Sequence, residues 1–167
     1  MSQLICCTET NEFKVKNVDE VKSVFEELGF TAYNNKVLNT VVAYSDDDMC
    51  FNEDMEVILS KKPIEKNGEK TNFVGVCSDC MGVSITDILL DYQLTTDDVV
   101  IQSICEYLQD QLITGCGITI TSAGFESRLG GNNNPFCEIT IITKNTVEYI
   151  SPCFLMEEKA KELGVEI

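Results

Sequence analysis

Cys77 and Cys80 have the spacing most typical of a chemical site in this sequence. Two residues separate them, so their sulfurs can converge on a zinc ion or form a redox dithiol, and they follow a predicted strand. A structural zinc site needs four ligands, and the adjacent pair Cys6 and Cys7 has poor chelating geometry. Packed thiols are therefore the favoured interpretation of Cys77 and Cys80, with a redox pair and a zinc site as alternatives.

A run of carboxylates between residues 46 and 56 is the second candidate. Its acids recur at short intervals, as in a calcium loop, but Phe51 stands where the sharp-turn glycine belongs and Val57 where the closing glutamate belongs. We therefore predict a solvated turn between two strands and no metal site. The carboxylates are Asp46, Asp47, Asp48, Glu53, Asp54 and Glu56.

The sequence lacks the residues and motifs that several classes of catalytic and cofactor-binding site require. The chain has no histidine, which excludes Ser-His, Cys-His and His-metal arrangements. It has no phosphate-binding loop motif, and Gly115 and Gly117 lie between a predicted helix and a predicted strand, the reverse of a dinucleotide-binding turn. The run Gly130 to Pro135 is typical of a hairpin loop. No catalytic residue and no cofactor is predicted, although an enzyme that uses carboxylates stays a rival.

The elements that must position these residues alternate between helix and strand signals. A helix is predicted from Val18 to Leu28, with Asn17 as its cap, Glu20 at the capping-box position and Gly29 at its end. Three more helices are predicted over Ser84–Tyr92, Thr95–Ile113 and, after Ser151, up to Leu163, where Leu155, Met156, Ala160 and Leu163 share one face.

Segments rich in β-branched and aromatic residues predict the strands. They are Phe13–Lys16, Val37–Tyr44, Met55–Ser60, Asn72–Cys77, Ile118–Ser122, Cys137–Thr143 and Thr146–Ile150, and Lys61–Lys70 is predicted to be a loop. This order favours one α+β domain over residues 1–167, with an antiparallel or mixed sheet and about four helices packed mainly on one face.

Charge is the strongest compositional signal. The 167 residues carry 28 Asp and Glu against 12 Lys and Arg, a net charge of −16, and Arg128 is the only arginine. Direct binding to nucleic acid through a basic surface is excluded, and an anionic membrane surface is disfavoured. The odd number of cysteines, nine, and the absence of a basic, apolar leader predict a cytoplasmic protein with reduced thiols.

The acids of the predicted helix 95–113 form a ladder. Asp98, Gln102, Glu106 and Asp110 fall opposite the expected apolar stripe, and about 12 Å of helix separates Asp98 from Glu106. No lysine or arginine occurs between Lys70 and Arg128 to neutralise them. Such a ladder could occupy a groove that binds phosphates, although acids at a helix start also complement the helix dipole.

In bulk character the chain resembles the small, acidic, cofactor-free anti-defence proteins of phages and mobile elements, such as DNA mimics. The resemblance implies an inhibitor that occupies the basic groove of a nucleic-acid-handling protein. We predict that its carboxylates pair with lysines and arginines of the target. The rivals are an immunity-type inhibitor of a toxin and a thiol or zinc protein centred on Cys77 and Cys80. The predicted partner-binding residues are Asp46, Asp47, Asp48, Glu53, Asp54, Asp98, Glu106 and Asp110.

Overall fold

The computed structural model describes residues 3–46, 51, 54–78, 82–127 and 134–164, and in them four α-helices and ten strands form. The side chains of residues 3–5, 125–127, 134 and 135 are not described. All strand pairs are antiparallel, which confirms the predicted α+β class.

The larger sheet has seven strands in the order β10-β9-β8-β1-β4-β2, with β3 also paired to β4. Its long central pairing joins β1 to β8, from Gln3 opposite Ser127 to Thr10 opposite Ile120. Strands β1 and β3 were not predicted from the sequence. The strands are β1 (Gln3–Thr10), β2 (Phe13–Lys14), β3 (Thr31–Asn35), β4 (Thr40–Ser45), β8 (Gly117–Ser127), β9 (Asn134–Thr143) and β10 (Val147–Ile150).

The smaller sheet has three strands in the order β6-β5-β7: β5 (Glu56–Lys66), β6 (Glu69–Cys77) and β7 (Val99–Ser103). The predicted loop over Lys61–Lys70 is wrong, because β5 and β6 run through it as one long hairpin. Asn67 and Gly68 make its tight turn, both with positive φ (53° and 80°), a conformation that asparagine and glycine tolerate best.

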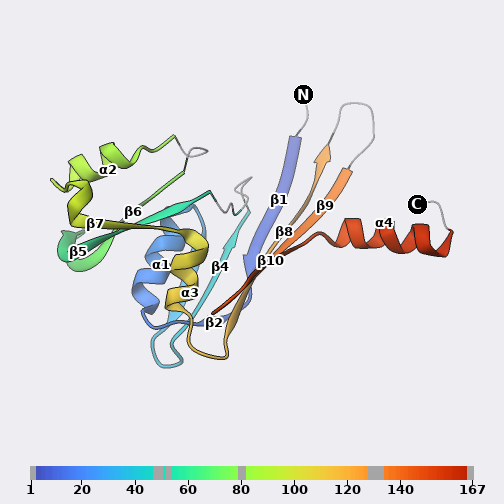
Figure 1. Ribbon diagram of the computed structural model, residues 1–167, viewed down its shortest axis with the longest axis horizontal. Helices are drawn as coiled ribbons and strands as arrows, with labels where there is room; N and C mark the ends of the chain where they lie inside the picture. Colours follow the sequence, from blue (N-terminus) through green and yellow to red (C-terminus); the bar gives the residue numbers. More distant parts are fainter. Residues whose placement is uncertain (1–2, 47–50, 52–53, 79–81, 128–133, 165–167) are drawn as a thin grey trace.

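Helices α1 (Val18–Glu27) and α3 (Ile104–Gln111) lie between the two sheets, on one face of the larger one (Figure 1). The Asn17 side chain caps α1 by accepting a hydrogen bond from the Glu20 amide at 3.1 Å. In both helices, apolar residues spaced three or four apart form one face that packs in the core, where Phe25 of α1 and Tyr107 of α3 are fully buried. The apolar core joins both helices to both sheets.

The predicted helix over Thr95–Ile113 is wrong in its first half. Only a 3₁₀ turn, η2 (Thr96–Asp98), forms at the expected cap, and the chain then enters β7. The run Val99, Val100 and Ile101 explains the difference, because β-branched side chains favour a strand and here pair with β5. A second cap, Ser103, starts α3 by accepting from the Glu106 amide at 3.2 Å.

Helix α2 (Ile85–Asp91) packs on the smaller sheet and closes a second apolar cluster there. Gly75 of β6 leaves room for this approach, since a Cβ at that position would lie 3.2 Å from Cγ2 of Ile88, tighter than most such contacts.

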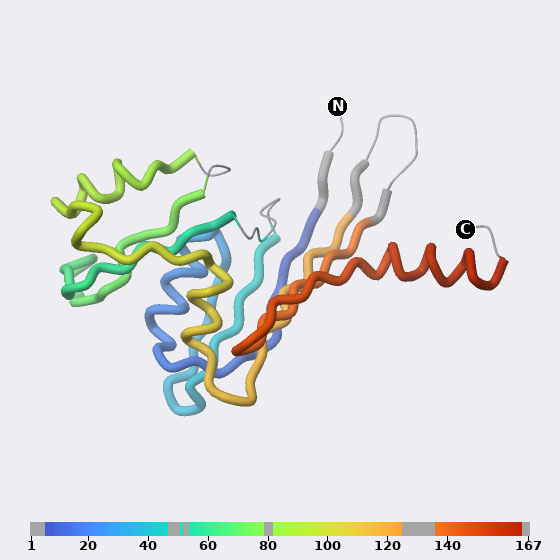
Figure 2. Tube along the Cα trace, viewed as in Figure 1, coloured from blue at the N-terminus to red at the C-terminus, as the bar shows by residue number. Residues whose placement is uncertain are grey.

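Helix α4 (Pro152–Leu163) follows β10 and ends at Gly164, as predicted. It leaves the larger sheet on the side away from α1 and α3, as its red trace shows (Figure 2). The face shared by four apolar residues is not packed as a whole: Ala160 is buried, whereas Leu155, Met156 and Leu163 are exposed. None of the helices in the described part of the chain is long and apolar enough to span a membrane.

Candidate functional site

One face of the larger sheet carries exposed polar and aromatic side chains near the end of β4. Side chains alternate between the two faces of the sheet along β1 and β4. Thr8, Thr10, Ala43 and Ser45 are buried on the face that the helices cover, so the residues between them point to the outer face. Glu9 lies directly opposite Tyr44, so the two side chains share that outer face. We define the open-face patch as Cys7, Glu9, Tyr33, Tyr44 and Asp46.

Acidic groups alone supply the charge within the open-face patch. The pKa of the Cys7 thiol is raised by partial burial and by the carboxylates Asp46 and Glu9. The pKa of Tyr44 is raised by its hydrogen bond to Tyr33, with a smaller contribution from Asp46. No lysine contributes to either shift among the residues that the structure describes, so the local field is negative.

A second group of acids gathers at the start of α3. The Ile104 amide donates to the Met55 carbonyl at 2.8 Å, which places Asp54 and Glu56 beside the first turn of the helix. Glu56 lies opposite Ser103 in the β5–β7 pair, and Ser103 caps the amide of Glu106. The structure thus brings Glu106 to the end of the β4–β5 connection that carries Asp54.

The other two acids of the predicted ladder, Asp98 and Asp110, have partners within the chain. Asp98 accepts from the Thr95 amide and hydroxyl, both at 2.8 Å, and these bonds, with Lys62 and Lys61 nearby, lower its pKa. Asp110 accepts from the Gln102 side chain at 2.8 Å. Lys144 lies close to it, because the ammonium of Lys144 donates to the Leu112 carbonyl at 3.0 Å and to the Asp110 carbonyl at 3.5 Å.

The ladder on one helix is therefore wrong for Asp98 and Gln102, which precede α3, whereas Glu106 and Asp110 share α3 as predicted. The expectation that no lysine lies near these acids is also wrong. Residues distant in sequence supply the lysines, since β5 pairs with β7 and the β9–β10 turn packs beside α3. The remaining predicted contact residues, Asp47, Asp48 and Glu53, lie outside the described part of the chain.

Sequence reasoning missed a polar groove between α1 and the β5–β6 hairpin, with a volume of about 530 Å³. We call it the hairpin groove. Lys66 crosses it: its ammonium donates to the Val74 carbonyl at 2.8 Å, lies 3.3 Å from the Glu27 carboxylate and sits 4.4 Å from the centre of the Phe73 ring. Burial raises the pKa of Glu27, and Lys66 opposes that shift.

Glu20 is a second acid of the hairpin groove and is half-buried. In a capping box the Glu20 carboxylate would accept a hydrogen bond from the Asn17 amide. Here that amide donates to the Gln111 side chain instead, at 3.3 Å. The Tyr107 hydroxyl donates to Glu20 at 3.0 Å. Burial raises the pKa of Glu20, and this hydrogen bond opposes the rise. Its place three residues after Asn17 is the capping-box pattern, so the sequence carried no signal for the contact with α3.

The cysteine pair gives no metal centre that can be described. Cys77 is buried, and its thiol donates to the Glu56 carboxylate at 3.6 Å, while Cys80 lies outside the described residues. No group of three or more potential metal ligands occurs among the side chains that the structure describes. The glycine and asparagine positions 130–133 also lie outside the described part.

Neither protein-family models, nor curated proteins, nor solved structures yield a match to this chain.

Proposed function

We propose that the chain is a cytoplasmic acidic binding protein that inhibits a nucleic-acid-handling protein by occupying its basic groove. Its contact surface comprises the open-face patch and the two ends of the β4–β5 connection, with Asp46 at one end and Asp54 beside Glu106 at the other. The inhibition is competitive, because the carboxylates take the positions that phosphates would take.

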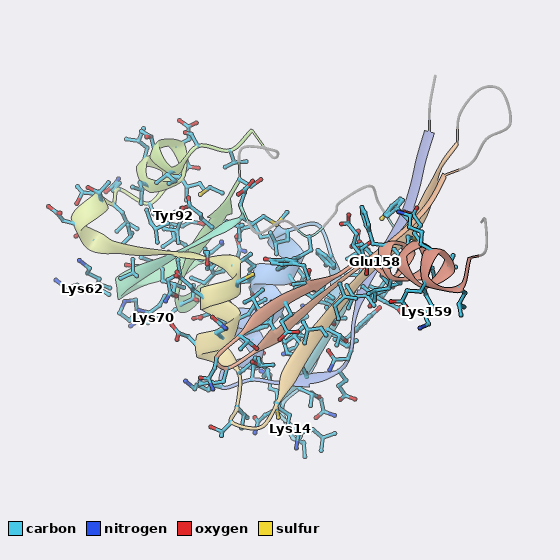
Figure 3. All side chains as sticks on the ribbon, turned by 45° about the vertical axis from the view of Figure 1, so that its right-hand side comes forward. Lys14, Lys62, Lys70, Tyr92, Glu158 and Lys159 are labelled. Carbon is cyan, nitrogen blue, oxygen red and sulfur yellow. The ribbon has the colours of Figure 1, made fainter. Side chains whose placement is uncertain are left out.

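The observation that supports this proposal is the negative local field at Cys7 and Tyr44. Besides burial, Asp46 and Glu9 raise the pKa of Cys7; besides the hydrogen bond to Tyr33, Asp46 raises the pKa of Tyr44; and no lysine of the described residues contributes to either shift. A field of one sign accelerates association with an oppositely charged surface and favours that partner over others. The lysines labelled in Figure 3 lie on other parts of the molecule: Lys62 and Lys70 on the smaller sheet, Lys14 on β2 and Lys159 on α4.

Two of the predicted contact residues have a smaller role in this proposal. Asp98 and Asp110 are held by hydrogen bonds within the chain and lie near its own lysines. They add to the overall negative charge that steers association. The contact itself is assigned to Asp46, Asp54 and Glu106 for their place around the β4–β5 connection, with Glu9 as an addition from the structure.

The test compares two variants with the same loss of charge. In the first, E9Q, D46N, D54N and E106Q are combined; in the second, E65Q, D91N, E157Q and E158Q remove four exposed carboxylates elsewhere. A partner is captured with the wild-type chain from cells that carry it and is then purified. Its affinity for each variant is measured at 50 and 300 mM salt, together with displacement of bound nucleic acid.

We expect the first variant to bind more than tenfold more weakly and the second to stay within about threefold of wild type. Added salt should weaken wild-type binding steeply and weaken the first variant less. Equal affinities of the two variants, or binding that displaces no nucleic acid, would count against the proposal. A captured toxin that binds no nucleic acid would indicate the immunity-type inhibitor instead.

A further inference from the structure

Two tyrosines form an aromatic platform within the open-face patch. The rings of Tyr33 and Tyr44 stack with their centres 6.3 Å apart and their planes 22° apart. Tyr33 opposes Val42 and Tyr44 opposes Thr31, so both side chains stand on the outer face of adjacent strands. They are 57% and 39% exposed, a large aromatic surface on the outer face of the sheet.

Two carboxylates border this platform. Glu9 of β1 lies directly opposite Tyr44. Asp46 follows β4 two residues after Tyr44 and acts on the pKa values of both Tyr44 and Cys7. The patch therefore combines ring faces, which carry partial negative charge, with two full negative charges beside them.

This combination selects among ligands that stack on tyrosine. A nucleobase also stacks on aromatic rings, but the phosphates attached to it would be repelled by Glu9 and Asp46. A second copy of the chain is disfavoured as the ligand, because it brings another net charge of −16. A planar cation satisfies both features, since it can stack on the rings and pair with a carboxylate.

We propose that the open-face patch is an arginine-selective docking surface, in which Tyr33 and Tyr44 stack against guanidinium groups of the partner and Glu9 and Asp46 pair with them. This inference rests on the proposed function and specifies the chemistry of the partner's groove. Arginine is preferred over lysine because its guanidinium is planar, is weakly hydrated and offers paired donors to a carboxylate. A lysine ammonium can also lie over a ring, but it is more strongly hydrated and has no planar pair of donors, so it gains less.

The test uses two peptides of equal charge, nona-arginine and nona-lysine, labelled with a fluorophore and titrated with the full chain at 50 mM salt. We expect wild type to bind nona-arginine about fivefold more tightly, from a cation–π contribution of about 1 kcal/mol at an exposed site. The double variant Y33T/Y44T should bring this ratio close to one, and Y33F/Y44F should preserve it. Threonine is chosen because it keeps the strand propensity of β3 and β4.

The acidic residues provide a contrasting variant. E9Q/D46N should weaken binding of both peptides, because it removes charge and leaves the rings in place. Thermal unfolding of each variant establishes that the sheet is intact. The inference is overturned if wild type binds both peptides equally, or if Y33T/Y44T keeps the full preference for nona-arginine.

The two proposals can fail separately. If Y33T/Y44T keeps the arginine preference while the fourfold carboxylate variant loses its captured partner, only the arginine inference fails. If the fourfold carboxylate variant keeps its partner and its inhibition, the proposed function fails, whatever ratio the two peptides give.

Discussion

The hairpin groove and the open-face patch are both rich in acids, but their acids have different partners. In the hairpin groove, Lys66 contacts Glu27, and the acids at its margin form ion pairs with Lys22 and Lys36. In the open-face patch the charged groups that act on Cys7 and Tyr44 are carboxylates. A strongly acidic composition therefore divides into charges that serve the fold and charges that face outward.

Burial explains the difference between the two regions. Glu20 is half-buried and Glu27, although more exposed, also loses hydration, so each gains from a hydrogen bond or an ion pair. Glu9 stands on an exposed sheet face, where water solvates a carboxylate without any protein partner. Three experiments test this contrast.

The largest expected effect is on stability, from Lys66→Ala. The substitution removes the ion pair to Glu27, the bond to the Val74 carbonyl and the contact with the Phe73 ring. We expect the free energy of unfolding in urea to fall by about 2 kcal/mol. The control is Lys22→Ala, which removes an exposed pair within α1 and should cost about 0.5 kcal/mol or less. Equal losses would show that the hairpin groove is no more dependent on its pairs than the surface is.

A smaller effect is expected from Glu20→Gln. Because the pKa of Glu20 is raised, the folded chain binds more protons than the unfolded chain above the ordinary glutamate value near 4.5, so stability is lost as pH rises through that window. Glutamine can still accept from Tyr107. The variant should be more stable than wild type at pH 7 by less than about 1 kcal/mol, after allowance for solvent screening.

Urea unfolding at several pH values checks this prediction. The advantage of Glu20→Gln should shrink as pH falls toward 4, where wild-type Glu20 becomes protonated. Glu65→Gln is the control, since Glu65 is exposed on the β5–β6 hairpin. A Glu20→Gln variant that is less stable at pH 7 would contradict the assignment of Glu20 as a buried charge.

The smallest effect is on the reactivity of Cys7. A raised pKa reduces the thiolate fraction at pH 8, so alkylation by iodoacetamide should be slow for an exposed cysteine. E9Q/D46N should speed the alkylation of Cys7 about two- to fivefold, and high salt should do the same by screening the two carboxylates. The effect is small because burial is the largest cause of the raised Cys7 pKa. Peptide mass spectrometry measures the rate at Cys7 itself. Unchanged rates in both conditions would mean that Glu9 and Asp46 exert no field there.

Local patterns predicted the elements whose ends carry strong signals. Asn17 and Gly29 delimit α1, and Ser84, Ser151 and Gly164 mark the limits of α2 and α4, because caps act within one turn of the chain. Capping signals gave a helix over residues 95–113 that is wrong in its first half, because the cap at Thr95 is followed by β-branched residues that pair with β5. Strand pairing of that kind depends on a partner distant in sequence.

The candidate site was predicted in part. Asp46, Asp54 and Glu106 were proposed as contacts from charge alone, and the prediction of their binding role stays a prediction. Glu9 and Tyr33 were missed because β1 and β3 were not predicted. Tyr44 falls in the predicted strand Val37–Tyr44, but nothing in the sequence shows that Glu9 and Tyr33 share a sheet face with it.

The amino-acid sequence alone was enough for the net charge of −16, the exclusion of histidine chemistry and the α+β class, since these depend on residue counts and on short-range periodicity along the chain. Tertiary structure decided which carboxylates meet a lysine. Lys66 reaches Glu27 across 39 residues, and Lys144 reaches the end of α3 across 34. Such pairs follow from the register of strands and the packing of helices, which bring together charges that no local pattern in the chain connects.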